Sequence, residues 1–220
     1  MGAAAPIAQG ELQQATPRPG ETDDRPSTSI RSGDTLVNPV TGETIHVRRA
    51  AADTAGELVE IEATVQPGGG VAAAHVHPFQ SERFEVLEGT LEFRRGRRKV
   101  TATAGDVVTV EPGTVHSFRN VGETPASFVC EVRPALQFKR FIETMFGLAA
   151  DGKTNRKGMP SPLRLAVIAN AHFDDLRLPY VPAFAQKAAL ATGAAIGRLA
   201  GFEPTYRPTP ALEPALNAAV

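Results

Sequence analysis

The sequence predicts a mainly β protein, built as a sandwich, jelly roll or barrel, followed by a helical extension. From about Thr35 to Arg133 apolar and polar residues alternate with a period of two, the period of a half-buried strand. Turn signals rich in Gly, Pro and Asn separate these runs, and no helical pattern interrupts them. Many short strands at close spacing are typical of β-sandwiches and β-barrels. The clearest alternating runs are residues 58–65, 82–88, 90–94 and 127–132.

After Pro134 the apolar period lengthens to that of a helix. An apolar stripe at i, i+3, i+4 and i+7 spacing predicts a first helix. The pair Ser161–Pro162 predicts the start of a second helix, with Ser as N-cap and Pro in the first turn. Pro182 opens a third, Ala- and Gly-rich helix that ends near Gly201. The stripe of the first helix consists of Phe138, Phe141, Ile142, Met145 and Leu148 or Ala149.

Composition divides the chain into four zones. Residues 1–30 have almost no bulky apolar side chains, so they are expected to be disordered. Residues 31–134 form the β domain, residues 135–203 the helical extension, and residues 204–220 a Pro- and Ala-rich flexible tail. The four zones together predict one domain with an appendage rather than two full domains.

Charge and cysteine content exclude several classes of function. Lys and Arg number 23 against 24 Asp and Glu, so the formal charge of −1 gives no field for nucleic acid or an acidic membrane. The single Cys130 excludes an intrachain disulfide framework and multi-cysteine zinc sites, and it suits a reducing compartment. No apolar run is long enough for a signal peptide or a spanning helix. A cytoplasmic protein is therefore expected.

Three of the five histidines fall in two short segments of the β region. His75 and His77 are two residues apart, so in a strand they project from the same face and can hold one metal ion. Glu82 follows a corner at Pro78 and can add an oxygen ligand, and His116 is the natural fourth ligand. Taken alone, the histidine pair is also compatible with a solvated loop.

The full arrangement resembles the cupin superfamily, specifically its small single-domain bacterial members. The resemblance covers about residues 35–133, and its two motifs are in register over roughly 50 residues. One position departs from the motif, because Glu111 stands where its first proline is expected, beside Pro112. That proline shapes a turn and binds no metal, so the ligand set is unaffected. The first motif matches Gly69, His75, His77, Glu82 and Gly89, and the second matches Gly105, Gly113, His116 and Asn120.

The resemblance implies a jelly-roll β-barrel (a double-stranded β-helix) in which His75, His77, Glu82 and His116 hold one divalent metal ion. Three imidazoles and one carboxylate suit Fe, Mn, Ni, Co, Cu or Zn. The leading hypothesis is a metal-dependent dioxygenase that acts on a small, partly hydrophobic metabolite, with Glu82 doubling as a proton acceptor. The alternatives are a non-oxidative isomerase, lyase or cyclase that uses the ion as a Lewis acid, and a binding protein without chemistry.

The remaining features carry weaker expectations. Phe84, Phe93, Phe118 and Asn120 share the ligand side of their strands and are candidates for substrate contact, although packing is the better interpretation for most residues on that side. The basic run 94–99 fits a solvated turn. His46 is expected at the surface, and His172 and Cys130 are expected to pack. The apolar stripes of the extension favour a homodimer or a cap on the barrel over a membrane contact.

Overall fold

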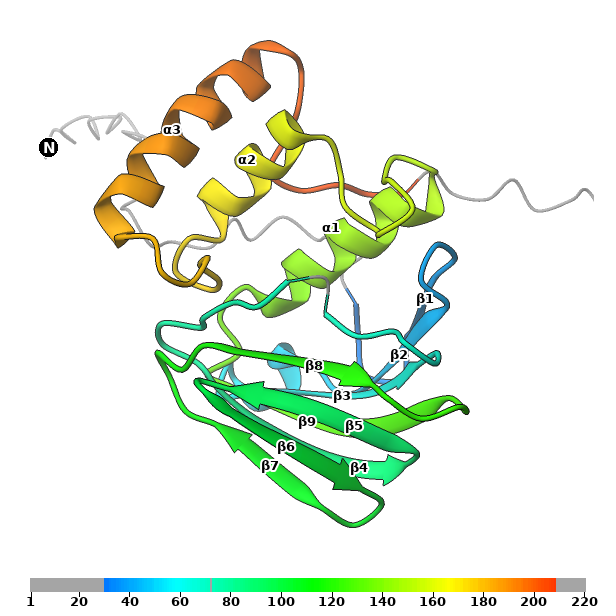
Figure 1. Cartoon of the computed structure of the whole chain (residues 1–220). Coiled ribbons are helices and arrows are strands. Elements are labelled where there is room, and N and C mark those ends of the chain that lie inside the picture. The colour runs from blue at the N-terminus through cyan, green and yellow to red at the C-terminus, as the bar shows by residue number, and fades with distance from the viewer. Residues whose placement is uncertain (1–29, 72, 209–220) are drawn as a thin grey trace, which may run out of the picture.

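The computed structural model describes residues 30–71 and 73–208. Antiparallel strands form a two-sheet barrel, and three helices gather on one side of it (Figure 1). The jelly-roll prediction with its helical extension is therefore confirmed. A short 3₁₀ helix, Ala51–Thr54, links two of the strands. The strands are β1 (Thr35–Asn38), β2 (Glu43–Arg49), β3 (Val59–Val65), β4 (Ser81–Glu88), β5 (Thr90–Arg95), β6 (Arg98–Thr103), β7 (Val107–Val110), β8 (His116–Asn120) and β9 (Ala126–Arg133).

The two sheets differ in size. The larger has the order β1-β2-β3-β9-β4-β7 and the smaller has the order β6-β5-β8. Neighbours such as β3 and β9 are far apart in sequence, which is expected when strands cross between the two sheets of a jelly roll. Side chains alternate between buried and half-buried along β3, and between buried and half-buried or exposed along most of β4. The period-two pattern of the sequence is thus the pattern of a sheet with one face in the core.

Residues 68–71 and 73–77, the histidine segment, pair with β8 at the edge of the smaller sheet. The pairing begins at Asn120, whose carbonyl accepts the Gly68 amide at 3.0 Å and whose amide donates to the Gly69 carbonyl at 2.8 Å. At Gly70 a side chain would not fit, because a Cβ would lie 2.3 Å from the Phe118 carbonyl oxygen, and the φ of +152° also favours glycine. This close approach brings the histidine segment against β8.

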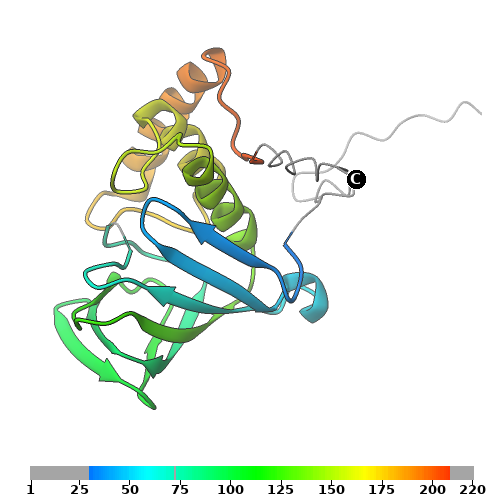
Figure 2. The same ribbon diagram turned by 90° about the vertical axis from the view of Figure 1, so that its right-hand side faces the viewer.

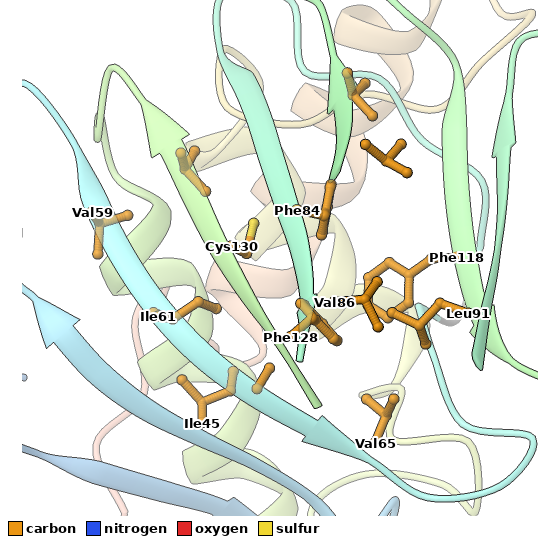
Figure 3. Close-up of a cluster of buried hydrophobic side chains, with 14 of the residues drawn as sticks. Ile45, Val59, Ile61, Val65, Phe84, Val86, Leu91, Phe118, Phe128 and Cys130 are labelled. Carbon is orange, nitrogen blue, oxygen red and sulfur yellow. The ribbon is translucent and has the colours of Figure 1, made fainter. Parts of the chain in front are cut away.

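The barrel interior is filled by aromatic and branched side chains (Figure 3). Phe84 lies at its centre, with ring centroids 5.1 Å from Phe93, 5.7 Å from Phe118 and 5.7 Å from Phe128. Tilted rings at such separations contribute beyond the area that they bury. The four rings pack together between the two sheets.

The helical extension consists of α1 (Phe138–Ala150), α2 (Pro162–Ala171) and α3 (Ala183–Leu199). Helix α1 packs on the core through Phe138, Ile142 and Met145, three residues of the predicted stripe. Helices α2 and α3 lie side by side, farther from the barrel (Figure 2). They approach closely at Gly197, where a Cβ would lie 2.6 Å from the Val167 side chain. None of the described helices is long and apolar enough to cross a membrane.

The predicted disordered segment, residues 1–30, lies outside the described residues except for Ile30, which is buried. The same holds for the predicted flexible tail beyond Pro208. The described start of that tail, residues 204–208, lies against α1, because the Tyr206 amide donates to Thr144 Oγ1 at 3.2 Å and its hydroxyl donates to Asp151 at 2.5 Å. The packed extension thus continues past residue 203, since an aromatic ring within a Pro-rich stretch finds partners on α1.

Candidate metal centre

Two neighbouring segments bring the predicted ligands together. His75 and His116 form an antiparallel pair, in which each amide donates to the other residue's carbonyl, at 3.0 and 2.9 Å. Directly opposed residues of antiparallel strands point to the same face. The Gly113 amide, in a left-handed turn with φ of +77°, donates to the His77 carbonyl at 2.8 Å. Glu82 enters from β4, on the inward face of the opposite sheet. Strand register therefore accounts for the convergence of the four side chains.

The four side chains each offer one ligand atom, and these atoms all lie within 4.8 Å of one another. His75 Nε2 lies 3.2 Å from His77 Nε2, and His116 Nε2 lies 2.7 Å from Glu82 Oε2. The second Glu82 oxygen lies 3.5 Å from His77 Nε2. Donors that share an ion at about 2.1 Å are separated by roughly 3 Å, so these distances fit a common metal ion.

Each imidazole is oriented by a backbone carbonyl at its Nδ1 atom. His75 Nδ1 lies 3.1 Å from the Ala73 oxygen, His116 Nδ1 lies 3.0 Å from the Thr114 oxygen, and His77 Nδ1 lies 2.5 Å from the Asp175 oxygen. A carbonyl can only accept, so the hydrogen-bond partners assign the proton to Nδ1. The three Nε2 lone pairs then face the shared centre, as in metal-ligating histidines.

The centre contains polar atoms that no protein group satisfies. Glu82 Oε2 and His116 Nε2 are fully buried and close to each other, yet neither forms a hydrogen bond of acceptable geometry. A carboxylate oxygen that faces an imidazole lone pair is unfavourable unless a proton or a cation lies between them. The donor set and its orphaned atoms therefore fit a divalent metal ion.

The pKa values at the centre reflect both burial and the close packing of the four groups. Burial, with the adjacent His116 and His77, lowers the pKa of His75 to about 4, which keeps its imidazole neutral at physiological pH. Burial alone would raise the pKa of Glu82, but contact with His116 and the charges of the other histidines outweigh it and lower the pKa. Burial opposes protonation of His116, whereas Glu82 favours it strongly enough to raise its pKa. Neutral His75 and ionised Glu82 are the forms that bind metal.

The predicted substrate residues have contacts of their own within the barrel. Phe84, Phe93 and Phe118 are at most 8% exposed and pack mainly on one another. Asn120 is fully buried, and its amide nitrogen donates to the carbonyls of Val65 and Thr124 while its oxygen accepts the Gly122 amide. These bonds close the turn after β8 and give the Asn120 amide a structural role, and substrate contact by Asn120 stays a prediction.

Glu111, His46 and Cys130, which the sequence analysis also named, have structural contacts. Glu111 is an exposed turn residue whose carbonyl accepts the Thr114 amide at 3.1 Å. His46 is exposed and contacts Thr35 at the edge of the larger sheet. Cys130 is buried opposite Phe84, and burial together with the Glu82 charge raises the pKa of its thiol, so it is an inert core residue.

Sequence reasoning missed the partners of the ligands in the helical extension. Asp175 supplies the carbonyl that orients His77, and its carboxylate contacts His172 Nδ1 at 3.1 Å. His172 was expected only to pack, which it does against Phe141, but it also holds this aspartate. Any residue has a backbone carbonyl, so the sequence cannot show which one orients His77. The available signal was Asp175 close to His172 in a segment that was expected to be helical.

Comparison with known proteins bears on the β domain. The family model described as "Cupin domain" matches residues 61–132. No match is found among curated proteins. Among solved structures, a predicted oxalate decarboxylase from Thermotoga maritima is 22% identical, with a TM-score of 0.40 over 42% of this chain and 80% of that one.

Two further solved structures resemble this chain to a similar extent. A sugar phosphate isomerase of the cupin superfamily from Silicibacter pomeroyi is 19% identical, with a TM-score of 0.40 over 46% of this chain and 71% of that one. An uncharacterized protein with a double-stranded β-helix domain from Klebsiella pneumoniae is 27% identical, with a TM-score of 0.35 over 51% and 84%. The matched family model and the jelly-roll topology agree, and the β-barrel of this chain is similar to a cupin domain over residues 61–132.

Proposed function

We propose that His75, His77, Glu82 and His116 bind one divalent transition metal ion and that the protein is a metal-dependent enzyme. One observation carries the proposal: three imidazole Nε2 atoms and a carboxylate converge in a buried centre whose closest donor pair has no hydrogen bond. Ligands of this kind suit Fe, Mn, Ni, Co, Cu or Zn, and the ligand set does not select among them.

The three histidines and Glu82 have different roles in the proposed centre. The three histidines bind the ion as neutral donors, each held by its carbonyl partner. Glu82 supplies the negative charge that offsets a divalent cation in this buried centre, and as an ionised carboxylate it can also accept a proton from a bound substrate. When bound, the ion supplies Lewis acidity and, for a redox-active metal, one-electron chemistry with dioxygen.

We infer that the reaction is an oxidation, of the dioxygenase class, on a small and partly hydrophobic organic molecule. The apolar surroundings of the ligands support this: Glu82 lies between Val110 and Val132 on the neighbouring strands, and Phe84 follows it on the same face of β4. Such walls exclude water and favour an apolar ligand over a sugar phosphate. Phe84, Phe93 and Phe118 remain predictions for substrate contact.

Elemental analysis of the purified full chain tests the metal site. We expect about one transition metal ion per chain for the wild type and almost none for His75→Ala and His116→Ala, because a lost ligand opens the centre. His46→Ala is the matched control, since His46 is exposed and far along the chain from the ligands. Equal metal content in all four proteins would refute the proposal.

Turnover measurements test the reaction class. The chain is reconstituted anaerobically with Fe(II), Mn(II) or Ni(II), and oxygen uptake is then followed on a panel of small aromatic and aliphatic metabolites. Oxygen uptake that depends on both metal and metabolite supports the dioxygenase. Turnover without oxygen, including with Zn(II), would replace it by a Lewis-acid isomerase, lyase or cyclase, and a metabolite that binds but is recovered unchanged would indicate a binding protein.

We also infer a homodimer formed through the exposed face of α3. Phe184 and Leu199 are 80% and 90% exposed at its two ends, and exposed alanines lie between them at spacings of four and three residues. In an antiparallel pair with twofold symmetry, Phe184 faces Leu199 of the partner subunit and Ala188 faces Ala195 of the partner subunit. Light scattering of Phe184→Glu should then show a monomer, whereas a wild-type monomer would refute the pairing.

The single, buried Cys130 supports a reducing compartment, and we propose the cytoplasm. Cell fractionation tests this directly.

A further inference from the structure

One of the three metal-site histidines differs from the others in what orients it. His75 and His116 use the carbonyls of Ala73 and Thr114, each two residues away within the same segment of the barrel. His77 uses the carbonyl of Asp175, which is 98 residues away and belongs to the helical extension. The bond is buried and short, at 2.5 Å between Nδ1 and the oxygen. The orientation of His77 therefore depends on how the extension docks.

The Asp175 carbonyl is fixed by its own side chain. Carboxylate Oδ1 accepts the Gln137 amide at 3.0 Å, and Oδ2 lies 3.1 Å from His172 Nδ1. The Asp175 amide donates to the His172 carbonyl at 3.0 Å. Gln137 precedes α1 and His172 follows α2, so this one residue ties both helices together at the point that faces His77. Both Asp175 and His172 are buried.

A second contact joins the same two segments. Val76, between the two histidines, pairs with Arg177 through two antiparallel backbone hydrogen bonds of 2.9 Å each. The extension thus forms an antiparallel β-bridge with the histidine segment, and its docking is specified at consecutive residues, 76 and 77. Backbone pairing of this kind fixes register as well as contact.

We propose that residues 172–177 are a positioning element of the metal centre, in which Asp175 holds His77 in the tautomer and orientation that present Nε2 to the ion. The proposal rests on the proposed metal binding. Outer partners of metal-ligating histidines fix the ring and raise its basicity, and their loss typically weakens metal affinity 10- to 100-fold. The helical extension is, on this view, a part of the metal site that the barrel alone lacks.

Affinity measurements on the full chain test the role of Asp175. A chromophoric chelator competes with each variant for Ni²⁺ or Zn²⁺. We expect Asp175→Ala to bind about 10- to 100-fold more weakly than the wild type. Asp175→Asn keeps an oxygen for the Gln137 amide and should recover most of that loss. The matched control is Asp106→Asn, which makes the same change in an exposed carboxylate that accepts hydrogen bonds from Thr103 in the turn before β7, outside residues 172–177.

Two readouts separate positioning from general damage. Nitrogen NMR of the metal-free chain reports the His77 tautomer, which should be Nδ1–H in the wild type and mixed in Asp175→Ala. Thermal unfolding of the metal-free variants measures the fold itself. If Asp175→Ala does not fold, His172→Ala removes one of the two carboxylate contacts and should weaken the metal by a smaller factor, with the same change of tautomer.

The outcomes are distinguishable. If the wild type binds metal and Asp175→Ala binds it equally well, the positioning role is refuted and the metal site stands. If the wild type binds no metal, the proposed function fails and the positioning role fails with it. Because coupling is reciprocal, metal should also slow hydrogen exchange of the Arg177 amide in the wild type, and unchanged exchange at saturating metal would count against the proposal.

Discussion

Glu82 and Glu43 are two largely buried carboxylates in different parts of the molecule, and their pKa values shift in opposite directions. Glu43 lies on β2, on the same face as Ile45 and Val47, and burial raises its pKa to about 7. Glu82 is more deeply buried, yet its pKa is lowered, because three histidines surround it and their attraction outweighs the burial.

The difference shows what distinguishes a candidate site from a buried polar residue. Burial by itself only makes the charged form of a carboxylate unfavourable, as at Glu43, for which the described part of the chain supplies no ion pair. At Glu82 the fold also supplies partners that favour the charge, from a different sheet and at distances of 2.7 to 3.5 Å. A buried carboxylate held in its ionised form is suited to bind a cation, and one held protonated is not.

The largest expected effect comes from removing each charge in turn and measuring metal affinity. Glu82→Gln should weaken binding of Ni²⁺ or Zn²⁺ by more than about 100-fold, because loss of a direct ligand costs more than loss of an outer partner. Glu43→Gln should leave the affinity unchanged, since Glu43 lies away from the ligands. Chelator competition measures both, and equal losses in the two variants would abolish the distinction between the carboxylates.

A smaller effect is expected on stability. Between pH values near 4.5 and 7 the folded chain keeps the Glu43 proton while the unfolded chain loses it, so the free energy of unfolding falls as the pH rises through this window. Glu43→Gln removes this dependence. At pH 8, relative to pH 5, the variant should gain about 1–2 kcal/mol over the wild type, allowing for partial exposure of the side chain.

Urea unfolding of both proteins at the two pH values gives this difference, and it cancels the titration of the histidines, which the two chains share. Parallel pH dependences in wild type and variant would show that Glu43 finds a partner on ionisation and is not an isolated buried acid.

Most of the fold was readable from the sequence because its signals are local. Alternation along residues 58–65 and 82–88 matches β3 and β4, and Ser161–Pro162 marks the start of α2. The motif spacing also placed His116 near His75, because strand register converts sequence offsets into neighbours. The packed start of the tail was not readable, since nothing in a Pro-rich stretch says that Tyr206 will reach α1.

The sequence predicted the side chains of the metal centre but not the backbone groups that contact them. The four predicted ligands converge, but the shared face that suggested substrate contact for Asn120 could not show that turn carbonyls occupy its amide. The partner of His77 was invisible, because a backbone carbonyl 98 residues away has no residue signature. The period-two pattern does place Glu43 on the same face as the buried Ile45. A carboxylate at a position that the pattern assigns to the core is a conflict that the sequence alone shows.

The smallest effect is expected at a third carboxylate, which completes the comparison. Glu85 lies on β4 like Glu82 but is paired with Arg83 at 3.0 Å, and both side chains are more than 40% exposed. Exposed pairs contribute little because water already stabilises both charges. Glu85→Gln should therefore change the free energy of unfolding by less than about 0.5 kcal/mol, and added salt should shrink even that difference. Metal affinity should not change. If Glu85→Gln lowers the free energy of unfolding by more than about 1.5 kcal/mol, an ion pair stabilises a carboxylate on this strand even when it is exposed. The difference between Glu82 and Glu43 would then depend on their partners alone and not on burial.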